Sequence, residues 1–145
     1  MKILTNTLTG RMLDYAAAKA MGFPSGEFEG SPGSVAVMTD AGVRMITCQS
    51  SITLLNIGTY WPSMDGDELV KLIANGRISI DQTVPVVVRC SMLSAADNQL
   101  VVTEAPDLHV AVIRCLVEAR LGLEVDIPER MVPENHRNAP RRMKL

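Results

Sequence analysis

The sequence predicts an α+β fold, with a small, mostly antiparallel sheet, two main helices and one short helix. Two stretches with apolar residues at helical spacing, residues 8–20 and 106–121, flank a middle that is rich in strand-like runs. Helices and strands that are segregated in this way favour helices packed on one face of an antiparallel sheet. We therefore expect the two flanking helices to pack together or against that sheet.

The N-terminal part begins with a short strand candidate, residues 2–5, and continues into the first helix over residues 8–20. Thr7 or Thr9 can cap the start of this helix by accepting a hydrogen bond from a backbone N–H. Gly22 suits the left-handed position that follows many helices. The first helix is therefore expected to stop just before it.

The first half of the middle predicts a loop and a hairpin. Residues 24–34 are rich in glycine and proline and are expected to form the loop. Residues 34–39 and 43–48 have the sequence pattern of two strands. Gly42 between them suits a turn position with positive φ, so the two runs are expected to form a hairpin. Residues 52–57 are a third extended candidate.

The second half of the middle predicts a short helix and two strands. The helix starts near Asp65, where acidic residues suit a helix N-terminus, and it ends at Gly76. Residues 84–90 form the strongest β run, although Pro85 restricts this run to an edge or a strand start. Residues 100–103 are a last short strand.

The second main helix, over residues 106–121, is apolar on more than one side. Pro106 has the fixed φ expected in a first helical turn, and Gly122 follows the last apolar position. A helix of this kind is either central to the core or buried by a partner chain. The second possibility predicts a homo-oligomer. In residues 124–127 acidic and apolar residues then alternate, which is typical of an extended segment.

Length and charge predict one domain over residues 1–132 and a basic, irregular tail over residues 133–145. The chain has 145 residues, a length typical of single domains. Its net charge is −2, but four of the last nine residues are basic, which leaves 10 basic against 16 acidic residues elsewhere. A mildly acidic body predicts attraction to neither nucleic acid nor membrane. No apolar stretch approaches the roughly 20 residues that span a bilayer.

The residue types that serve metals and nucleophilic catalysis do not form a recognisable pattern. The cysteines Cys48, Cys90 and Cys115 and the histidines His109 and His136 lack the close pairing of zinc ligands. We therefore expect no metal, no cofactor and no catalytic residue with a local motif. An odd number of cysteines, with no signal-like apolar run at the start, favours a reducing cytoplasm.

Four residues are candidates for ligand or partner binding: Tyr60, Trp61, His109 and Arg114. The Tyr60-Trp61-Pro62 segment holds two of the five aromatic residues and precedes a predicted helix. It could stack a base or bind a peptide, although packing of this segment onto the core is the favoured interpretation. For His109, a position on a helix surface or in the core is the default interpretation.

The two terminal segments carry a family resemblance. Residues 8–20 read LTGRMLDYAAAKA, and residues 112–128 read VIRCLVEARLGLEVDIP. They resemble the Leu-Thr-Gly-x-x-Leu-Asp and Met-Arg-Cys-Tyr-Val patterns of the NinX-like group, small tailed-bacteriophage proteins of unassigned function. Together the segments cover about a third of the chain, while residues 34–103 depart from the family's Gly-Gly-Pro-Ile-Ile middle.

The resemblance implies a phage-encoded accessory protein that works in the host cytoplasm, and it transfers no active residue. The favoured hypothesis is stoichiometric binding to a host protein or a nucleotide-like ligand, with no catalysis. One alternative is a structural component of the virion or its scaffold. Another is a small enzyme that uses scattered groups, which would need at least two of them in one pocket. Those groups are Arg114, Asp126, His109 and Asp40.

Overall fold

The computed structural model describes residues 1–27, 34–47 and 58–132. Over these residues the fold is α+β, as the sequence predicts, with helices and small antiparallel sheets. The expected single sheet is instead divided into three separate sheets, of two, three and three strands. The predicted strand over 52–57 and the basic tail over 133–145 lie outside the described residues.

Three α-helices are found in the described part of the chain: α1 (Gly10–Ala20), α2 (Gly66–Gly76) and α3 (Leu108–Leu121). Helix α2 has 11 residues, as many as α1, so it is not the shorter helix that the sequence predicts. Thr9 occupies the N-cap position of α1, but its side chain makes no capping hydrogen bond. Helix α3 starts after the capping residue Asp107, so Pro106 precedes the helix instead of joining its first turn.

Helix α2 does not end at the residue that the sequence predicts, and the difference bears on how α2 packs against α3. The left-handed residue is Arg77, with φ of 50°, and Gly76 still belongs to the helix. A Cβ atom on Gly76 would lie 3.0 Å from Cδ1 of Leu116 and 3.1 Å from Cγ1 of Ile78. Gly76 therefore allows α2 to approach α3 closely, and this contact is one reason for a glycine at that position.

The first three-stranded sheet has the order β2-β3-β4 and is antiparallel. The hairpin between β3 and β4 is confirmed, with Gly42 at φ of 105°. The expectation of a loop was wrong for residues 25–27, because Gly26 pairs with Ala36 in an antiparallel ladder that needs no apolar side chains. The strands are β2 (Ser25–Glu27), β3 (Val35–Thr39) and β4 (Gly42–Ile46).

The second three-stranded sheet has the order β5-β6-β7 and is also antiparallel. Pro85 and Val86 form the turn between its first two strands, so the predicted run over 84–90 is divided by this turn. The lack of a backbone N–H at Pro85 costs nothing in a turn, whereas it would remove a ladder bond from the central strand. The strands are β5 (Ser79–Val84), β6 (Val87–Leu93) and β7 (Leu100–Ala105).

The third sheet joins the two ends of the described chain. Strand β1 (Lys2–Leu4) pairs antiparallel with β8 (Glu124–Asp126), with Ile3 opposite Val125. The 3-10 turn η1 (Thr5–Thr7) follows β1, and η2 (Glu129–Met131) follows β8. Both extended segments were expected from the sequence, and their pairing to each other is what the structure adds.

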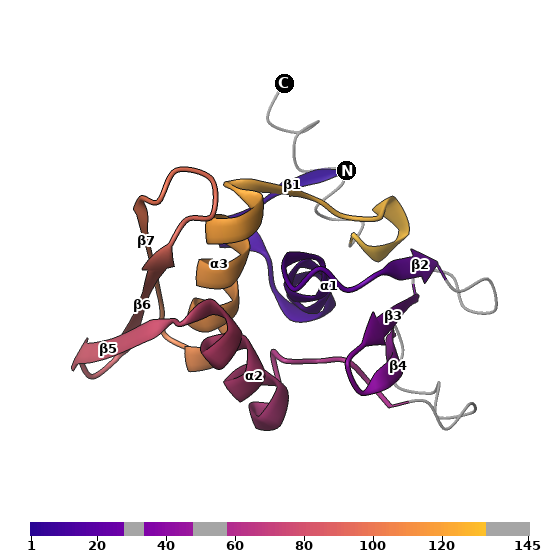
Figure 1. The fold of residues 1–145 in the computed structure, drawn as a ribbon, viewed down its shortest axis with the longest axis horizontal. Helices are drawn as coiled ribbons and strands as arrows, with labels where there is room; N and C mark the ends of the chain where they lie inside the picture. The colour runs from indigo at the N-terminus through magenta and orange to yellow at the C-terminus, as the bar shows by residue number, and fades with distance from the viewer. Residues whose placement is uncertain (28–33, 48–57, 133–145) are drawn as a thin grey trace, which may run out of the picture.

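The elements form successive layers, which Figure 1 shows from one side to the other. The β5–β6–β7 sheet covers α3, α3 packs on α1, and β4 of the other sheet contacts α1, while α2 packs against α3. The expected contact between the two flanking helices is therefore confirmed. Seven residues of α3 are buried by the chain's own elements, so the apolar character of this helix is explained without a partner.

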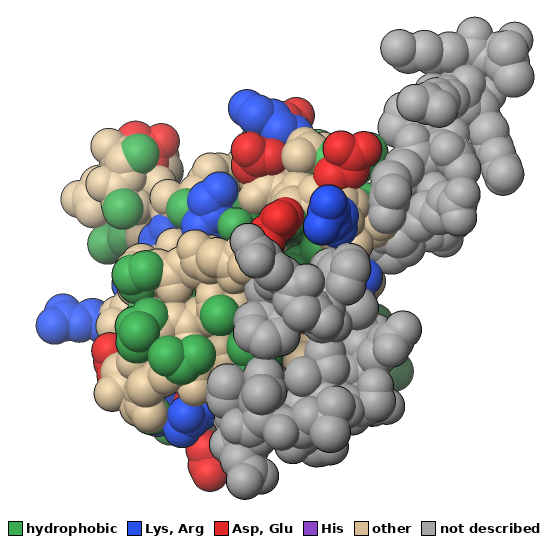
Figure 2. All heavy atoms as spheres, turned by 90° about the vertical axis from the view of Figure 1, so that its right-hand side faces the viewer, with side chains coloured by type: hydrophobic (Ala, Val, Ile, Leu, Met, Phe, Trp, Pro, Cys, Tyr) green, Lys and Arg blue, Asp and Glu red, His purple; other side chains and the backbone are tan. Residues whose placement is uncertain are grey.

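One hydrophobic core runs through these layers and includes residues from Leu8 to Val132. Apolar side chains also reach the surface, and several are visible on the face toward β2, β3 and β4 (Figure 2). In the part of the chain that the structure describes, no helix has the length and apolarity to cross a membrane.

Candidate functional site

Residues 60–65 form a sharp turn that leads into α2, and we call this turn the Trp61 corner. The chain enters it beside β4, where the amide of Tyr60 donates a hydrogen bond of 2.9 Å to the carbonyl of Met45. Within the corner, the amides of Met64 and Asp65 both donate to the carbonyl of Trp61, each at 2.8 Å. The backbone of the corner is thus hydrogen-bonded to β4 on one side, and hydrogen bonds within the corner stabilise the turn itself.

Tyr60 anchors the corner in the core. Its side chain is only 1% exposed, and its ring meets the ring of Phe23 edge to face, with centroids 6.0 Å apart. Edge-to-face pairs of this kind are favoured by the charge distribution of aromatic rings. The hydroxyl of Tyr60 is buried and has no hydrogen-bond partner among the described residues. Core packing, the favoured interpretation of this segment, therefore holds for Tyr60.

Asp14 of α1 holds the corner from one side. One carboxylate oxygen accepts a hydrogen bond from the amide of Ser63 at 2.8 Å, and the other accepts from the Ser63 hydroxyl at 3.0 Å. Asp14 is buried among the alanines of α1, with 4% of its surface exposed. A buried carboxylate with two donors from a single residue fixes the position of that residue closely.

His109 of α3 holds the corner from the other side. Its Nδ1 lies 2.8 Å from the carbonyl oxygen of Pro62, and because a carbonyl can only accept, Nδ1 carries the hydrogen. The amide of His109 donates to the side chain of Asp107, which caps α3. The first turn of α3 is therefore connected directly to the residue that follows Trp61.

Burial dominates the electrostatics of the site. It raises the pKa of Asp14 to about 6, against the opposing effects of the Ser63 hydrogen bonds and the nearby His109. Burial also raises the pKa of Tyr60, and the neighbouring carboxylates of Glu68 and Asp14 raise it further. Asp14, Tyr60, Ser63 and His109 thus form one polar cluster under the corner, with contributions from α1, α3 and the turn.

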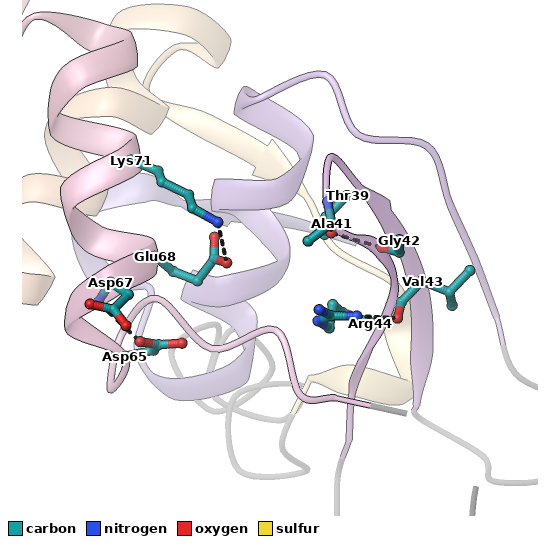
Figure 3. A network of polar contacts seen from close by, with 9 residues as sticks. All are labelled: Thr39, Ala41, Gly42, Val43, Arg44, Asp65, Asp67, Glu68 and Lys71. Carbon is teal, nitrogen blue, oxygen red and sulfur yellow. Dashed lines mark hydrogen bonds and ion pairs between the residues drawn. The ribbon is translucent and has the colours of Figure 1, made fainter. Parts of the chain in front are cut away.

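The outer side of the corner presents apolar groups. Trp61 is 48% exposed and Met64 is 72% exposed. Three acidic residues follow within the start of α2, where Asp65 accepts from the amide of Asp67 and Glu68 pairs with Lys71 at 3.2 Å (Figure 3). The corner therefore combines an exposed tryptophan and methionine with a neighbouring acidic helix start.

The predicted site residues are only partly brought together. Tyr60, Trp61 and His109 meet at the corner, although only Trp61 among them faces solvent broadly. Arg114 lies elsewhere on α3, where its Nε and Nη2 donate to the carbonyl of Leu8 at 3.2 and 3.0 Å. Burial lowers the pKa of Arg114, and its contacts with Leu8 connect α3 to the start of α1.

The scattered groups of the enzyme hypothesis also lie apart. Asp126 accepts a hydrogen bond of 2.8 Å from the N-terminal amine, which lowers the pKa of its exposed carboxyl group. Asp40 is exposed in the turn between β3 and β4. His109 and Arg114 bind the backbone of two different segments. His109, Arg114 and Asp126 thus make their polar contacts in three separate places.

The described residues form neither a metal-binding cluster nor a reactive thiol site. Those residues contain no group of three or more His, Cys, Asp or Glu side chains able to hold a metal ion. Cys90 and Cys115 are buried, and burial raises the pKa of Cys90 to about 11 and that of Cys115 to about 12. Both thiols are therefore protonated at neutral pH and pack as small apolar groups. Cys48 lies outside the described residues.

Sequence reasoning missed two members of the polar cluster, Asp14 and Ser63. For Asp14 a signal existed, since it is an acidic residue on the alanine-rich helix that also carries the Leu-Thr-Gly-x-x-Leu-Asp resemblance. Ser63 gave no signal of its own. No protein-family model matches the chain, and no curated protein matches its sequence.

Proposed function

We propose that this chain is a phage-encoded accessory protein that binds a host protein stoichiometrically, without catalysis, through the Trp61 corner. The observation that carries the proposal is an exposed tryptophan on a turn that is fixed from several sides. Tyr60 is buried before it, and the carbonyl of Pro62 accepts from His109 after it. The phage origin rests on the resemblance of the terminal segments to the NinX-like group.

Fixed display of Trp61 favours binding for an energetic reason. Tryptophan is among the residues that contribute most to protein interfaces, because a large apolar ring can fill a partner's pocket. Association loses less free energy when the backbone that carries such a residue is already ordered. The hydrogen bonds that Ser63 donates to Asp14 supply that order before any partner arrives.

The charges beside the corner favour a protein over a nucleotide-like ligand. Asp65, Asp67 and Glu68 follow Trp61 and Met64 closely, and among them Glu68 has Lys71 as its cationic partner. A base could stack on Trp61, but the phosphates that accompany it would meet these carboxylates. The partner that fits the corner is a protein surface with an apolar pocket bordered by basic residues.

A homo-oligomer is a second candidate, and a different surface favours it. On the outer face of the β5–β6–β7 sheet, Leu93 pairs with Leu100 across the strands, and both side chains are exposed. Val102 on the same face is also exposed. A sheet face of this kind could be covered by a second copy of the chain, as an oligomeric virion or scaffold component would require.

The experiment that tests the proposed binding is native mass spectrometry of the tagged chain isolated from infected host cells. We compare the natural chain with Trp61→Ala and with Val86→Ala, a control because Val86 is 70% exposed on another turn. The proposal expects one defined protein adduct, lost in Trp61→Ala and kept in Val86→Ala. An adduct that persists in Trp61→Ala, or a nucleotide adduct in its place, would contradict it.

A further inference from the structure

We propose that the outer face of the β5–β6–β7 sheet binds a second copy of this chain, across a two-fold axis that runs along the strands between β6 and β7. The inference rests on the homo-oligomer named above as a second candidate, and it specifies the surface and the register of the contact. Binding through the Trp61 corner does not enter it, because the corner lies between β4 and α2 and is not part of this sheet.

The two faces of this sheet differ in what covers them. Alternate residues of β6 are buried on the face that packs against α3, namely Val88, Cys90 and Met92. On β7, the hydroxyl of Thr103 donates a hydrogen bond of 2.8 Å to the carbonyl of Ala111 in α3, so Thr103 lies on the same inner face. The residues that alternate with these point to the opposite, outer face, which lies at one end of the layered molecule (Figure 1).

The outer face has an apolar end and a charged end, and the strand register aligns both. Leu93 of β6 lies opposite Leu100 of β7, and the two residues are 56% and 63% exposed. At the other end of the same strands, Arg89 lies opposite Glu104 and forms an ion pair of 3.1 Å with it, with about half of each side chain exposed. Val102, which is also exposed, lies between the two pairs on β7. The character of the face therefore changes along the strands and is matched between them.

This pattern is complementary to itself about one two-fold axis. Rotation about an axis parallel to the strands, midway between β6 and β7, places β6 of one copy over β7 of the other at the same height. Leu93 then faces Leu100 of the second copy, and Arg89 faces Glu104 of the second copy. The four charges alternate in sign, so each has an opposite charge beside it in its own chain and across the contact. Packed sheets are roughly 10 Å apart, a distance that arginine and glutamate side chains can span together.

The same residues oppose the other two-fold arrangements of this face. An axis along β6 itself would set Arg89 over Arg89 of the second copy. An axis across the strands would set the charged end over the apolar end and bury charges against leucine. An axis between β5 and β6 would set Arg89 over Asp81, its neighbour on β5, but would leave Leu100 outside the contact. Of these axes, the one between β6 and β7 satisfies both ends of the face together.

The size of the face sets the expected strength of the dimer. The three strands have six or seven residues each, so the face spans roughly 14 Å by 20 Å. A contact of this size is at the low end of specific interfaces, where association is weak and reversible. We therefore expect a dimer that dissociates in the micromolar range, with both Trp61 corners outside the contact.

Sedimentation velocity of the full chain, from about 1 to about 200 μM, tests the surface. The natural chain should change from monomer to dimer as its concentration rises. Leu100→Ser should raise the dissociation constant at least about tenfold, because each substitution occurs twice in a symmetric dimer. Val70→Ser is the matched control. Val70 is also 63% exposed, but it lies on α2, so this variant should dimerise as the natural chain does.

Charge reversal tests the register of the contact. Arg89→Glu and Glu104→Arg should each weaken the dimer at least about tenfold, because like charges then meet across the contact. Two combinations should restore it. An equimolar mixture of the two single variants pairs two acidic side chains with two basic ones, and the double variant R89E/E104R again alternates in sign. Far-UV circular dichroism checks that each variant is folded.

The contrary results separate the parts of the proposal. A natural chain that stays monomeric over the whole range overturns both this dimer and the homo-oligomer. A dimer that persists in Leu100→Ser keeps the homo-oligomer but overturns this surface, and a failure of both charge combinations to restore the dimer overturns the register. A monomer that loses a host-protein adduct in Leu100→Ser would assign the face to a different partner. Binding through Trp61 is measured separately with Trp61→Ala, so it stands or fails independently of these results.

Discussion

Two turns of this molecule contain proline and expose a large apolar residue, yet they are built differently. The Trp61 corner is connected to other elements by Asp14 of α1 and His109 of α3. The turn between β5 and β6 exposes Val86 more fully, and among the described side chains Gln82 of the adjoining strand donates a hydrogen bond to the Pro85 carbonyl. Exposure alone therefore does not mark a binding surface, whereas exposure on a backbone held by distant elements is a stronger indication.

The largest expected difference between the two turns concerns burial. Tyr60→Ala removes a ring that is 99% buried against Phe23, and it should lower the free energy of unfolding by about 3–5 kcal/mol. Val86→Ala should change the same quantity by less than about 0.5 kcal/mol, as exposed substitutions usually do. Urea unfolding of both variants measures this. Similar losses in the two variants would show that the corner is no better anchored than the β5–β6 turn.

The second prediction concerns the buried charge, which the β5–β6 turn lacks. A pKa raised to about 6 means that Asp14 stabilises the fold below its ordinary 3.8 and loses this effect as pH rises through about 6. Asp14→Asn should therefore raise the free energy of unfolding at about pH 7.5, by at most about 3 kcal/mol. At about pH 4 the variant and the natural chain should be nearly equal. Urea unfolding at both values checks the sign, and a variant less stable at about pH 7.5 would contradict it.

A smaller effect distinguishes the side-chain bonds of the two turns. Ser63→Ala removes one hydroxyl donor from a buried carboxylate, which should cost about 0.5–1.5 kcal/mol. Gln82→Ala removes a bond of 3.1 Å at an exposed position and should cost less than about 0.5 kcal/mol. The pair is compared by chemical unfolding at one pH. Equal effects would mean that the Asp14–Ser63 contact does not specially fix the corner.

The smallest expected effect is that of Tyr60→Phe. The Tyr60 hydroxyl is buried without a partner among the described residues, so its removal should leave stability unchanged or raise it by up to about 1 kcal/mol. Thermal unfolding is sensitive enough to detect such a change. A loss of more than about 1 kcal/mol would contradict this expectation, because it would mean that the hydroxyl forms a stabilising hydrogen bond.

The sequence predicts the frame of the molecule well because its signals are local. Apolar spacing, Gly22 and Gly122 locate the two flanking helices to within about two residues, and Gly42 locates the hairpin. The division into three sheets was missed because strand pairing depends on partners far apart in the chain. The pairing of β1 with β8 joins residues more than a hundred positions apart, and no local pattern indicates it.

The candidate site was predicted in part for a similar reason. Aromatic content drew attention to Tyr60 and Trp61, while the direction of each side chain depends on tertiary packing. Asp14 meets Ser63 across 49 positions, so their contact is invisible in either segment alone. Arg114 has the chemistry of a ligand-binding residue, but the structure shows that it binds the Leu8 carbonyl. Residue type therefore predicts which groups can bind and leaves their partners open.

The claim that the corner is ordered before binding can be tested most directly by 15N relaxation of the free chain at about pH 5. Order parameters of the backbone amides at Trp61 and Ser63 should be near 0.85, the value typical of rigid backbone. The amide of Val86 in the β5–β6 turn should give a clearly lower value. Values below about 0.6 at Trp61, or equal mobility in the two turns, would contradict an ordered corner that presents Trp61 to a partner.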